Sequence, residues 1–403
     1  MSALNRRGFL TGAGILAAGL GMGTAHAQSS SGRETGSSGS SGTEGAPVAA
    51  DLRFRPDGKF RVVQFNDTQD SHLTDRRTIE FMGLVLDRER PDFALINGDV
   101  IASGPTTDEQ VYQALNNVVR PMEDRSVPWA ITFGNHDEDP NEEPGVNVSK
   151  PDMVDFVRRY RHNLNSPAET GGYGNSNVHL VIGDSAAGDP RFALWLLDSG
   201  SYLPDEVAGQ SKEDLPGYDY IRPQQIEWYR GESLRTERAC GHRVDSLMFF
   251  HIPTFEHRDM WFGGPGKDGL VAHGRAERRH GIEGVKKEDV YHGSFNSGIY
   301  SAVVERGDVR GIYCGHDHIN SFRGNFFGVE LGYCPGTGFG TYGLMDGTWA
   351  MHTMRGARVF DLDENADGVY TGTRLVFAKD LGVDMNPAGQ PIEEPEAFPD
   401  YVR

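Results

Sequence analysis

The chain has 403 residues, 37% of them hydrophobic and 24% charged, which is enough apolar material for a substantial folded core. Its formal net charge is −19, and an acidic balance of this size argues against a surface that binds nucleic acid. Only three cysteines occur, Cys240, Cys314 and Cys334, so at most one disulfide can form and a disulfide scaffold is excluded.

The first 27 residues are predicted to be an export signal. Residues 5–10 read Asn-Arg-Arg-Gly-Phe-Leu, a twin-arginine signature, and residues 25–27 read Ala-His-Ala, a small-residue cleavage pattern. The Gly/Ala/Leu run between them is too weakly hydrophobic to span a membrane, so no transmembrane anchor is expected in the mature chain. We therefore expect recognition by the twin-arginine export machinery and a periplasmic or extracellular location.

Residues 28–50 are dominated by Ser, Gly, Thr and Glu, with almost nothing apolar. Such a segment cannot bury surface, so it is predicted to be a flexible linker. Residues 51–403 are then expected to form the folded domain.

Strand and helix patterns alternate from residue 58 onward. Strands are predicted at 60–65, 93–96 and 129–133, with helices at 78–90 and 108–123 between them. This order implies a sheet with helices packed outside it. The remaining chain is predicted to contain few helices, a loop over the site at 273–292, and strands at 178–182, 192–197, 247–250, 309–313, 329–333, 357–362 and 373–377.

Five of the predicted strands are followed directly by polar motifs. They are Asp67-Thr68-Gln69, Gly98-Asp99, Gly134-Asn135-His136-Asp137, His251-Ile252-Pro253 and Gly315-His316-Asp317-His318. Ligands of open α/β sheets gather outside the carboxyl ends of strands, so these side chains should meet at one edge. A mixed set of carboxylate, amide and imidazole groups suits a pair of transition-metal ions, as in two-metal hydrolysis of phosphate esters.

These five blocks, in this order, resemble the calcineurin-like metallophosphoesterase superfamily, which also contains the purple acid phosphatases. The resemblance covers roughly residues 58–378. It implies an α/β fold of the αββα type, a two-layer β-sandwich flanked by helices. It also implies a site with two divalent or trivalent metal ions, of Fe, Mn or Zn.

The resemblance implies a role for each site residue. Asp99 would bridge the two metals. Asp67, Gln69 and His318 would hold one metal, and Asn135, His251 and His316 would hold the other. His136 would protonate the leaving alcohol or steady the transition-state charge, with Asp137 orienting its imidazole.

Two positions depart from the family pattern. Gln69 stands where the family usually has His, and Asp70 or His72 could take its place as ligand. Ala102 stands where purple acid phosphatases carry Tyr, three residues after the bridging Asp. Without that phenolate no charge-transfer colour is expected, so the resemblance is closer to colourless, single-domain relatives. The other histidines have no ligand spacing and are expected at the surface.

The sequence therefore predicts an exported dinuclear-metal phosphoric ester hydrolase, a phosphomonoesterase that uses a metal-activated water. A phosphodiesterase on the same metals is the alternative, acting on a cyclic nucleotide, glycerophosphodiester or cell-wall polymer. A third hypothesis is a non-catalytic metal-binding envelope protein whose site has decayed at Gln69. The presence of every other expected ligand argues against decay.

Overall fold

The computed structural model describes residues 51–167, 173–213, 215, 217–263, 273–345 and 350–402. All of these belong to the compact unit Gly45–Arg403. The predicted signal peptide and linker lie outside the described residues and stay predictions. No helix in the described ranges is both long enough and apolar enough to cross a membrane.

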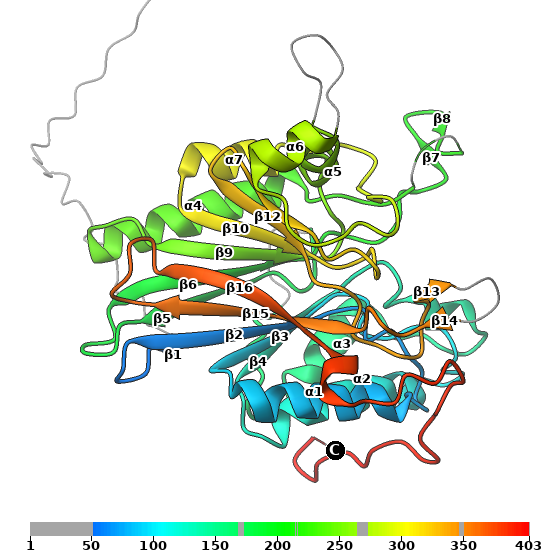
Figure 1. Ribbon diagram of the computed structural model, residues 1–403. Coiled ribbons are helices and arrows are strands. Elements are labelled where there is room, and N and C mark those ends of the chain that lie inside the picture. Colours follow the sequence, from blue (N-terminus) through cyan, green and yellow to red (C-terminus); the bar gives the residue numbers. More distant parts are fainter. Residues whose placement is uncertain are drawn as a thin grey trace, which may run out of the picture. The chain divides into compact units, whose positions relative to one another are not determined.

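The first large sheet has five strands in the order β16-β15-β2-β3-β4 (Figure 1). Its strands β2 (Lys59–Phe65), β3 (Phe93–Asn97) and β4 (Trp129–Thr132) run parallel to one another. The strands β15 (Gly356–Asp363) and β16 (Tyr370–Phe377) form an antiparallel pair that continues the sheet beyond β2. The parallel half of this sheet follows the predicted β-α-β-α-β order.

The second large sheet has seven strands in the order β1-β5-β6-β9-β10-β12-β11. Four neighbouring strands in it, β6, β9, β10 and β12, are parallel. The strands are β1 (Leu52–Arg53), β5 (Val178–Gly183), β6 (Pro190–Leu197), β9 (Asp245–Phe250), β10 (Val309–Cys314), β11 (Arg323–Phe326) and β12 (Val329–Tyr333).

Helices cover the outer face of each sheet (Figure 1). The outer face of the five-stranded sheet packs against α1 (Arg76–Glu89), α2 (Asp108–Glu123) and α3 (Lys150–Val157). The seven-stranded sheet packs against α4 (Pro223–Cys240), α5 (Phe255–Phe262) and α7 (Ile299–Arg306), while α6 (His273–His280) packs on α5. Short elements complete the fold: β7 (Glu206–Val207), β8 (Gln210–Ser211), β13 (Leu344–Met345), β14 (Ala350–Met351), η1 (Asp139–Glu142) and η2 (Ala378–Leu381).

The two sheets share a buried core. Along β2, Phe60 and Val62 belong to the core between the sheets, whereas Val63 and Phe65 face the helices. Alternate side chains of a strand point to opposite faces, so each central strand contributes to two cores. This arrangement confirms the predicted two-layer β-sandwich flanked by helices.

The predicted strands all have counterparts, and the helix predicted at 108–123 has the same bounds as α2. The prediction of few helices in the second half is wrong, because α4 to α7 lie there. The buried face of α4 mixes Ile226 and Tyr229 with Ser233 and Thr236, so its hydrophobic periodicity is weak. Residues 273–280 likewise form α6 rather than part of a loop, and its buried residues are only Ala276 and His280.

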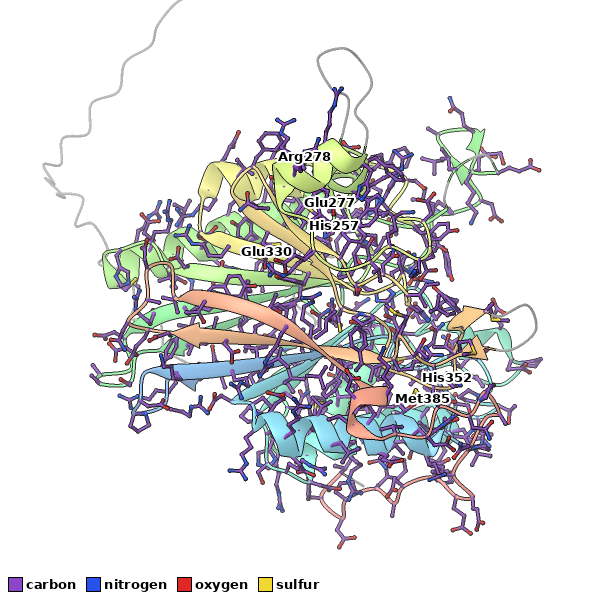
Figure 2. All side chains as sticks on the ribbon, in the orientation of Figure 1. His257, Glu277, Arg278, Glu330, His352 and Met385 are labelled. Atoms are coloured by element: carbon purple, nitrogen blue, oxygen red, sulfur yellow. The ribbon has the colours of Figure 1, made fainter. Side chains whose placement is uncertain are left out.

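Among the described residues, the histidines outside the motifs form no second group of candidate metal ligands. His257 belongs to the first turn of α5, and His352 lies near Met385 in the opposite half of the molecule (Figure 2). Both are buried, at 0% and 3% exposure, so the expectation that they are surface residues is wrong. All three cysteines are free, and Cys314 is a buried core residue beside His257.

A matched pair of leucines tests the core between the sheets. Leu247 on β9 is fully buried there, and Leu247→Ala should lower the free energy of unfolding by about 2–5 kcal/mol. Leu234 is 38% exposed on α4, and Leu234→Ala should change it by no more than about 0.5 kcal/mol. Chemical denaturation measures both, and equal effects would contradict a core at this position.

Candidate metal centre

The five motifs meet where strands of both sheets end. Asp67, Asp99 and Asn135 follow β2, β3 and β4, while His251 follows β9 and the last motif follows β10. Asn97, the last residue of β3, joins the two sheets here. Its Nδ2 donates to the carbonyl oxygens of Phe250, at 3.0 Å, and Tyr313, at 3.2 Å. The ends of β3, β9 and β10 are therefore held together across the sandwich.

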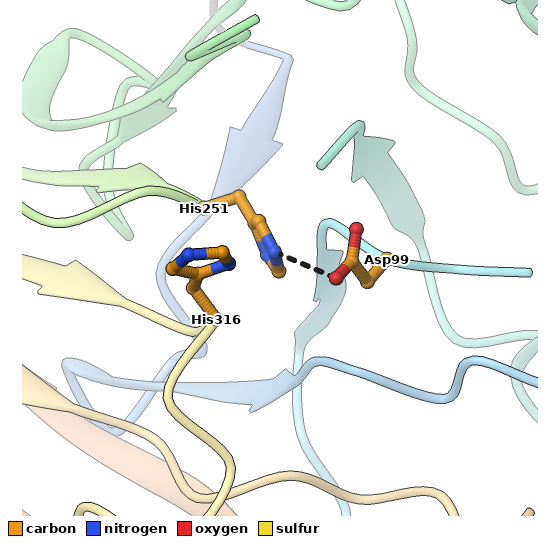
Figure 3. A group of neighbouring side chains, drawn as sticks. All are labelled: Asp99, His251 and His316. Carbon is orange, nitrogen blue, oxygen red and sulfur yellow. Dashed lines mark ion pairs between the residues drawn. The ribbon is translucent and has the colours of Figure 1, made fainter. Parts of the chain in front are cut away.

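Two overlapping groups of buried ligands form at this edge. One group is Asp99, His251 and His316, and the other is Asp67, Asp99 and His318; within each, the ligand atoms lie within 4.8 Å of one another. Figure 3 shows the first group, in which His251 Nε2 lies 3.0 Å from Asp99 Oδ2. In the second group His318 Nε2 lies 3.3 Å from Asp67 Oδ1. Asp99 belongs to both groups, the position predicted for the bridging carboxylate.

The unpaired atoms of these side chains fit a metal ion. Asp99 Oδ2, Asn135 Oδ1, His251 Nε2 and His316 Nε2 are buried and have no hydrogen bond in the described part of the chain, although Asp99 Oδ2 and His251 Nε2 form the ion pair described above. Buried polar atoms without a partner are costly, so such a concentration of them indicates a ligand. Carboxylate, amide and imidazole donors together suit Mn, Fe or Zn. The residues present therefore fit the two expected metals.

The opposite ends of the same side chains are already bonded. His251 Nδ1 donates to the carbonyl oxygen of Asn97 at 2.9 Å, which leaves Nε2 as the ligand nitrogen. Asn135 Nδ2 donates to the hydroxyl of Tyr202 at 2.7 Å, which leaves Oδ1 free. Asp99 Oδ1 accepts from the backbone N–H of His136 at 2.9 Å. These contacts aim the free atom of each side chain at the centre.

The backbone at the centre adopts strained conformations. Asp67, Gln69, Asp99 and His316 have φ values of 48°, 26°, 46° and 73°. Positive φ is uncommon outside glycine and costs on the order of 1–3 kcal/mol for each residue. Because four predicted ligands share this conformation, the fold holds these turns against their local preference.

Gly134, the first residue of the third motif, leaves no room for a side chain. A Cβ at Gly134 would lie 2.2 Å from Asp99 Oδ1 and 2.5 Å from the His251 ring. No side chain fits there without moving the bridging carboxylate. The Gly-Asn-His-Asp motif therefore begins with glycine because the second motif packs directly against its backbone.

Burial and nearby charges set the protonation of the cluster. Burial tends to raise the pKa of Asp67 and Asp99, but the charges of His318 and His251 outweigh it, and both pKa values are lowered. Burial and the charge of His251 lower the pKa of His316 to about 3. The two carboxylates are thus ionised and His316 is neutral, the forms that bind a cation. Burial tends to lower the pKa of His251, but Asp99 and Asp67 raise it to about 9, so a metal ion bound there would displace a proton from this imidazole.

Gln69 lies at the boundary between the centre and an open groove. Its Oε1 accepts from the hydroxyl of Thr341 at 3.1 Å, and its side chain lines the groove together with His136. The alternatives Asp70 and His72 belong to neither ligand group. Both oxygens of Asp70 accept backbone N–H bonds, from Ser71 and Asp75. Gln69 as a ligand stays a prediction.

The imidazole of His136 is held by Asp139 rather than by Asp137. His136 Nδ1 lies 2.5 Å from Asp139 Oδ2, across one turn of chain. Burial tends to lower the pKa of His136, but Asp139 and the charge of Asp99 raise it to about 9. The prediction that Asp137 orients His136 is therefore wrong, and Asp139 has this position.

Asp137 instead fastens the backbone of two motifs together. Its Oδ1 accepts from the N–H groups of Val100 and Ile101, at 2.7 and 3.1 Å, and its Oδ2 accepts from Gly134 at 2.7 Å. Both oxygens of Asp137 thus bond backbone N–H groups, while the imidazole of His136 contacts Asp139. Asp317, the buried acid of the last motif, also holds another part of the chain. It accepts a hydrogen bond from the hydroxyl of Tyr333 at 2.6 Å.

Three tyrosines contact ligands and were not predicted from sequence. Tyr202 bonds Asn135, as described above. Tyr342 stacks on His318 with ring centroids 3.9 Å apart, and Tyr218 meets His316 edge-on at 4.4 Å. All three lie in connections far from the motifs in sequence, and no local pattern marks them.

The fold and the two groups of buried side chains are consistent with a site for two metal ions. Residues 60–320 match the family model described as calcineurin-like phosphoesterase. The chain belongs to this family.

The chain is similar to several named proteins. It is 26% identical over 345 residues to probable inactive purple acid phosphatase 29 of Arabidopsis thaliana, covering 78% of this chain and 79% of that protein. It is 27% identical over 349 residues to phosphatase DCR2 of Saccharomyces cerevisiae, covering 80% and 55% respectively. A solved dimetal phosphatase from Danio rerio aligns with a TM-score of 0.43 and 13% identity, covering 79% of this chain and 99% of that one.

Because Asp99 belongs to both ligand groups, its replacement should affect the number of bound metal ions more than replacement of any ligand that belongs to one group. Protein loaded with Mn²⁺ and dialysed should retain about two ions per chain, as the two ligand groups imply. His316→Ala should retain about one ion because only one group loses a donor, whereas Asp99→Ala should retain fewer than His316→Ala. Elemental analysis against protein concentration measures this. Equal loss in both variants would contradict a bridging role.

Proposed function

We propose that the protein is an exported hydrolase of phosphoric esters, and specifically a phosphomonoesterase. The single observation that carries the proposal is the pair of ligand groups sharing Asp99, with His136 beside them. The presence of Asp67, Asp99, Asn135, His251, His316 and His318 at this edge supports a working site.

The chain's own side chains supply positioning and proton transfer. When bound, the two metals would supply an activated water and positive charge for the phosphate oxygens. Asp67, Gln69 and His318 would hold one, and Asn135, His251 and His316 the other, with Asp99 between them. Asp139 binds Nδ1 of His136 and leaves Nε2 to face the substrate, so His136 can donate a proton to the leaving oxygen.

A non-catalytic role is the second candidate, because the Arabidopsis relative is named probable inactive and Gln69 replaces an expected histidine. Weaker binding of one metal by an amide oxygen would leave the site incomplete. The other donors argue for retained activity. A phosphodiesterase would use the same metal ligands, so only the preferred substrate, a diester or a monoester, distinguishes the two activities.

We also propose that the twin-arginine route exports the protein to the periplasm or beyond. The Arg6-Arg7 pair and the following apolar run support this. Replacing both arginines with lysine should retain the protein in the cytoplasm, as cell fractionation would detect. Unchanged export would contradict the proposed route.

The proposed activity has a direct assay. Metal-stripped protein reloaded with Mn²⁺, Fe or Zn²⁺ should hydrolyse p-nitrophenyl phosphate faster than bis-p-nitrophenyl phosphate, and stripping should abolish turnover. Preference for the diester would support a phosphodiesterase. No turnover with two metals bound would support the non-catalytic candidate.

The His136–Asp139 pair predicts graded losses of rate. His136→Ala should retain both metals but lower kcat by roughly 10²–10⁴-fold, the usual size of a general-acid contribution. Asp139→Asn should lower kcat by about tenfold, because the imidazole loses its charged partner. Glu142→Gln, an exposed change in the same loop, is the matched control and should leave kcat unchanged. Loss of metal from His136→Ala would contradict the assigned role.

A further inference from the structure

An open groove lies directly beside the metal centre, on the side of His136. We call it the His136 groove. Its described lining consists of Gln69, Asp70, Ser71, Ala102, Ser103, Gly104, His136, Asp139, Gly340 and Thr341. His136 therefore joins the two regions, since its backbone N–H bonds Asp99 and the residue lines this groove.

The His136 groove is polar and lacks large apolar side chains. Ser71, Ser103 and Thr341 contribute hydroxyl groups, and Gln69 contributes an amide. Ala102 is the largest apolar residue among its described lining residues, which include no aromatic ring other than the imidazole. A planar aromatic or hydrocarbon group would find little to pack against here, and it would displace water from polar atoms without replacing the hydrogen bonds.

The charge of the His136 groove disfavours an anionic occupant. Asp70 and Asp139 line it, and its described lining residues include neither lysine nor arginine. A second phosphate or a carboxylate on the leaving group would face these two acids, and the imidazole of His136, the one basic side chain of the described lining, is already paired with Asp139. An uncharged occupant avoids that repulsion.

Several polar groups of the groove retain capacity for hydrogen bonds. Asp139 uses Oδ2 for His136, and no bond within the described chain occupies its Oδ1. The hydroxyl of Ser103 and the NH₂ group of Gln69 are likewise unused by described residues, and Ser103 is exposed. The groove thus offers both donors and acceptors, and hydroxyl groups can satisfy both kinds.

We propose that the leaving group of the substrate is a small, uncharged polyol, of the glycerol or sugar kind, held in the His136 groove. This rests on the proposed function, because a proton donor must reach the leaving oxygen and the rest of the alcohol must then lie in the groove beside it. In the reaction, water oxygen forms the new P–O bond and the P–O bond to the polyol breaks. The polyol leaves as a neutral alcohol with the proton from His136, which recovers one from the water, and inorganic phosphate is the other product.

The test compares substrates that differ only in the leaving group. Metal-loaded protein should hydrolyse glycerol 1-phosphate with a kcat/KM about tenfold or more above that of n-propyl phosphate, which has the same carbon chain without the two hydroxyls. It should disfavour 3-phosphoglycerate, in which a carboxylate replaces the terminal CH₂OH group, by about tenfold relative to glycerol 1-phosphate. Equal kcat/KM values for the three esters would overturn the proposal.

Substitution of Ser103 tests whether the His136 groove causes the preference for the polyol ester. Ser103→Ala should reduce the ratio of kcat/KM for glycerol 1-phosphate to that for n-propyl phosphate by about threefold or more, since one hydrogen-bond partner is lost. Ser301→Ala, an exposed change on α7 outside the groove, is the control and should leave the ratio unchanged. An unchanged ratio in Ser103→Ala would overturn the placement.

Binding supplies a readout apart from turnover. In the slow His136→Ala protein loaded with metal, calorimetry should show tighter binding of glycerol 1-phosphate than of n-propyl phosphate. Equal affinities would count against the proposal. Failure of the proposed function would look different, because none of these esters, p-nitrophenyl phosphate included, would then be hydrolysed. Hydrolysis of p-nitrophenyl phosphate without a preference for the polyol overturns only the inference drawn from the groove.

Discussion

The structure depends on one shared carboxylate, Asp99, buried where two sheets meet. Its Oδ1 is taken by a backbone N–H of the neighbouring motif, and its Oδ2 faces an imidazole that comes from the other sheet. A buried charge of this kind needs compensation, which His251 and the expected metals provide. Asn97 holds the two sheets in register at this point, because its amide bonds the ends of β9 and β10.

The backbone around the site adopts strained conformations. Left-handed turns at Asp67, Asp99 and His316 point the ligands inward, and the large buried core of both sheets holds them there. The acids that look catalytic in the sequence divide into two kinds. Asp137 and Asp317 fasten loops, whereas Asp139 touches the imidazole of His136. Different acids therefore position the loops of the metal site and the imidazole of His136 beside the groove.

Much of this arrangement was predictable from sequence, because the apolar runs typical of strands are followed directly by the polar motifs. The ligands Asp67, Asp99, Asn135, His251, His316 and His318 follow strands, and parallel strands bring their carboxyl ends to one edge. The pairing of His136 with Asp139 was not predictable, since either acid lies within reach along the chain and only the backbone bonds of Asp137 decide between them. The tyrosines Tyr202, Tyr218 and Tyr342 come from distant connections, and α4 lacks a clean apolar stripe. Tertiary packing alone determines these features.

The central claim is that Asp99 joins two metal positions into a single centre. Electron paramagnetic resonance of the protein loaded with two equivalents of Mn²⁺ tests it most directly, because ions bridged by a carboxylate a few ångströms apart are magnetically coupled. A bridged pair should give a coupled dimanganese spectrum that Asp99→Ala abolishes. An uncoupled six-line Mn²⁺ signal from the fully loaded wild-type protein would contradict a bridged pair.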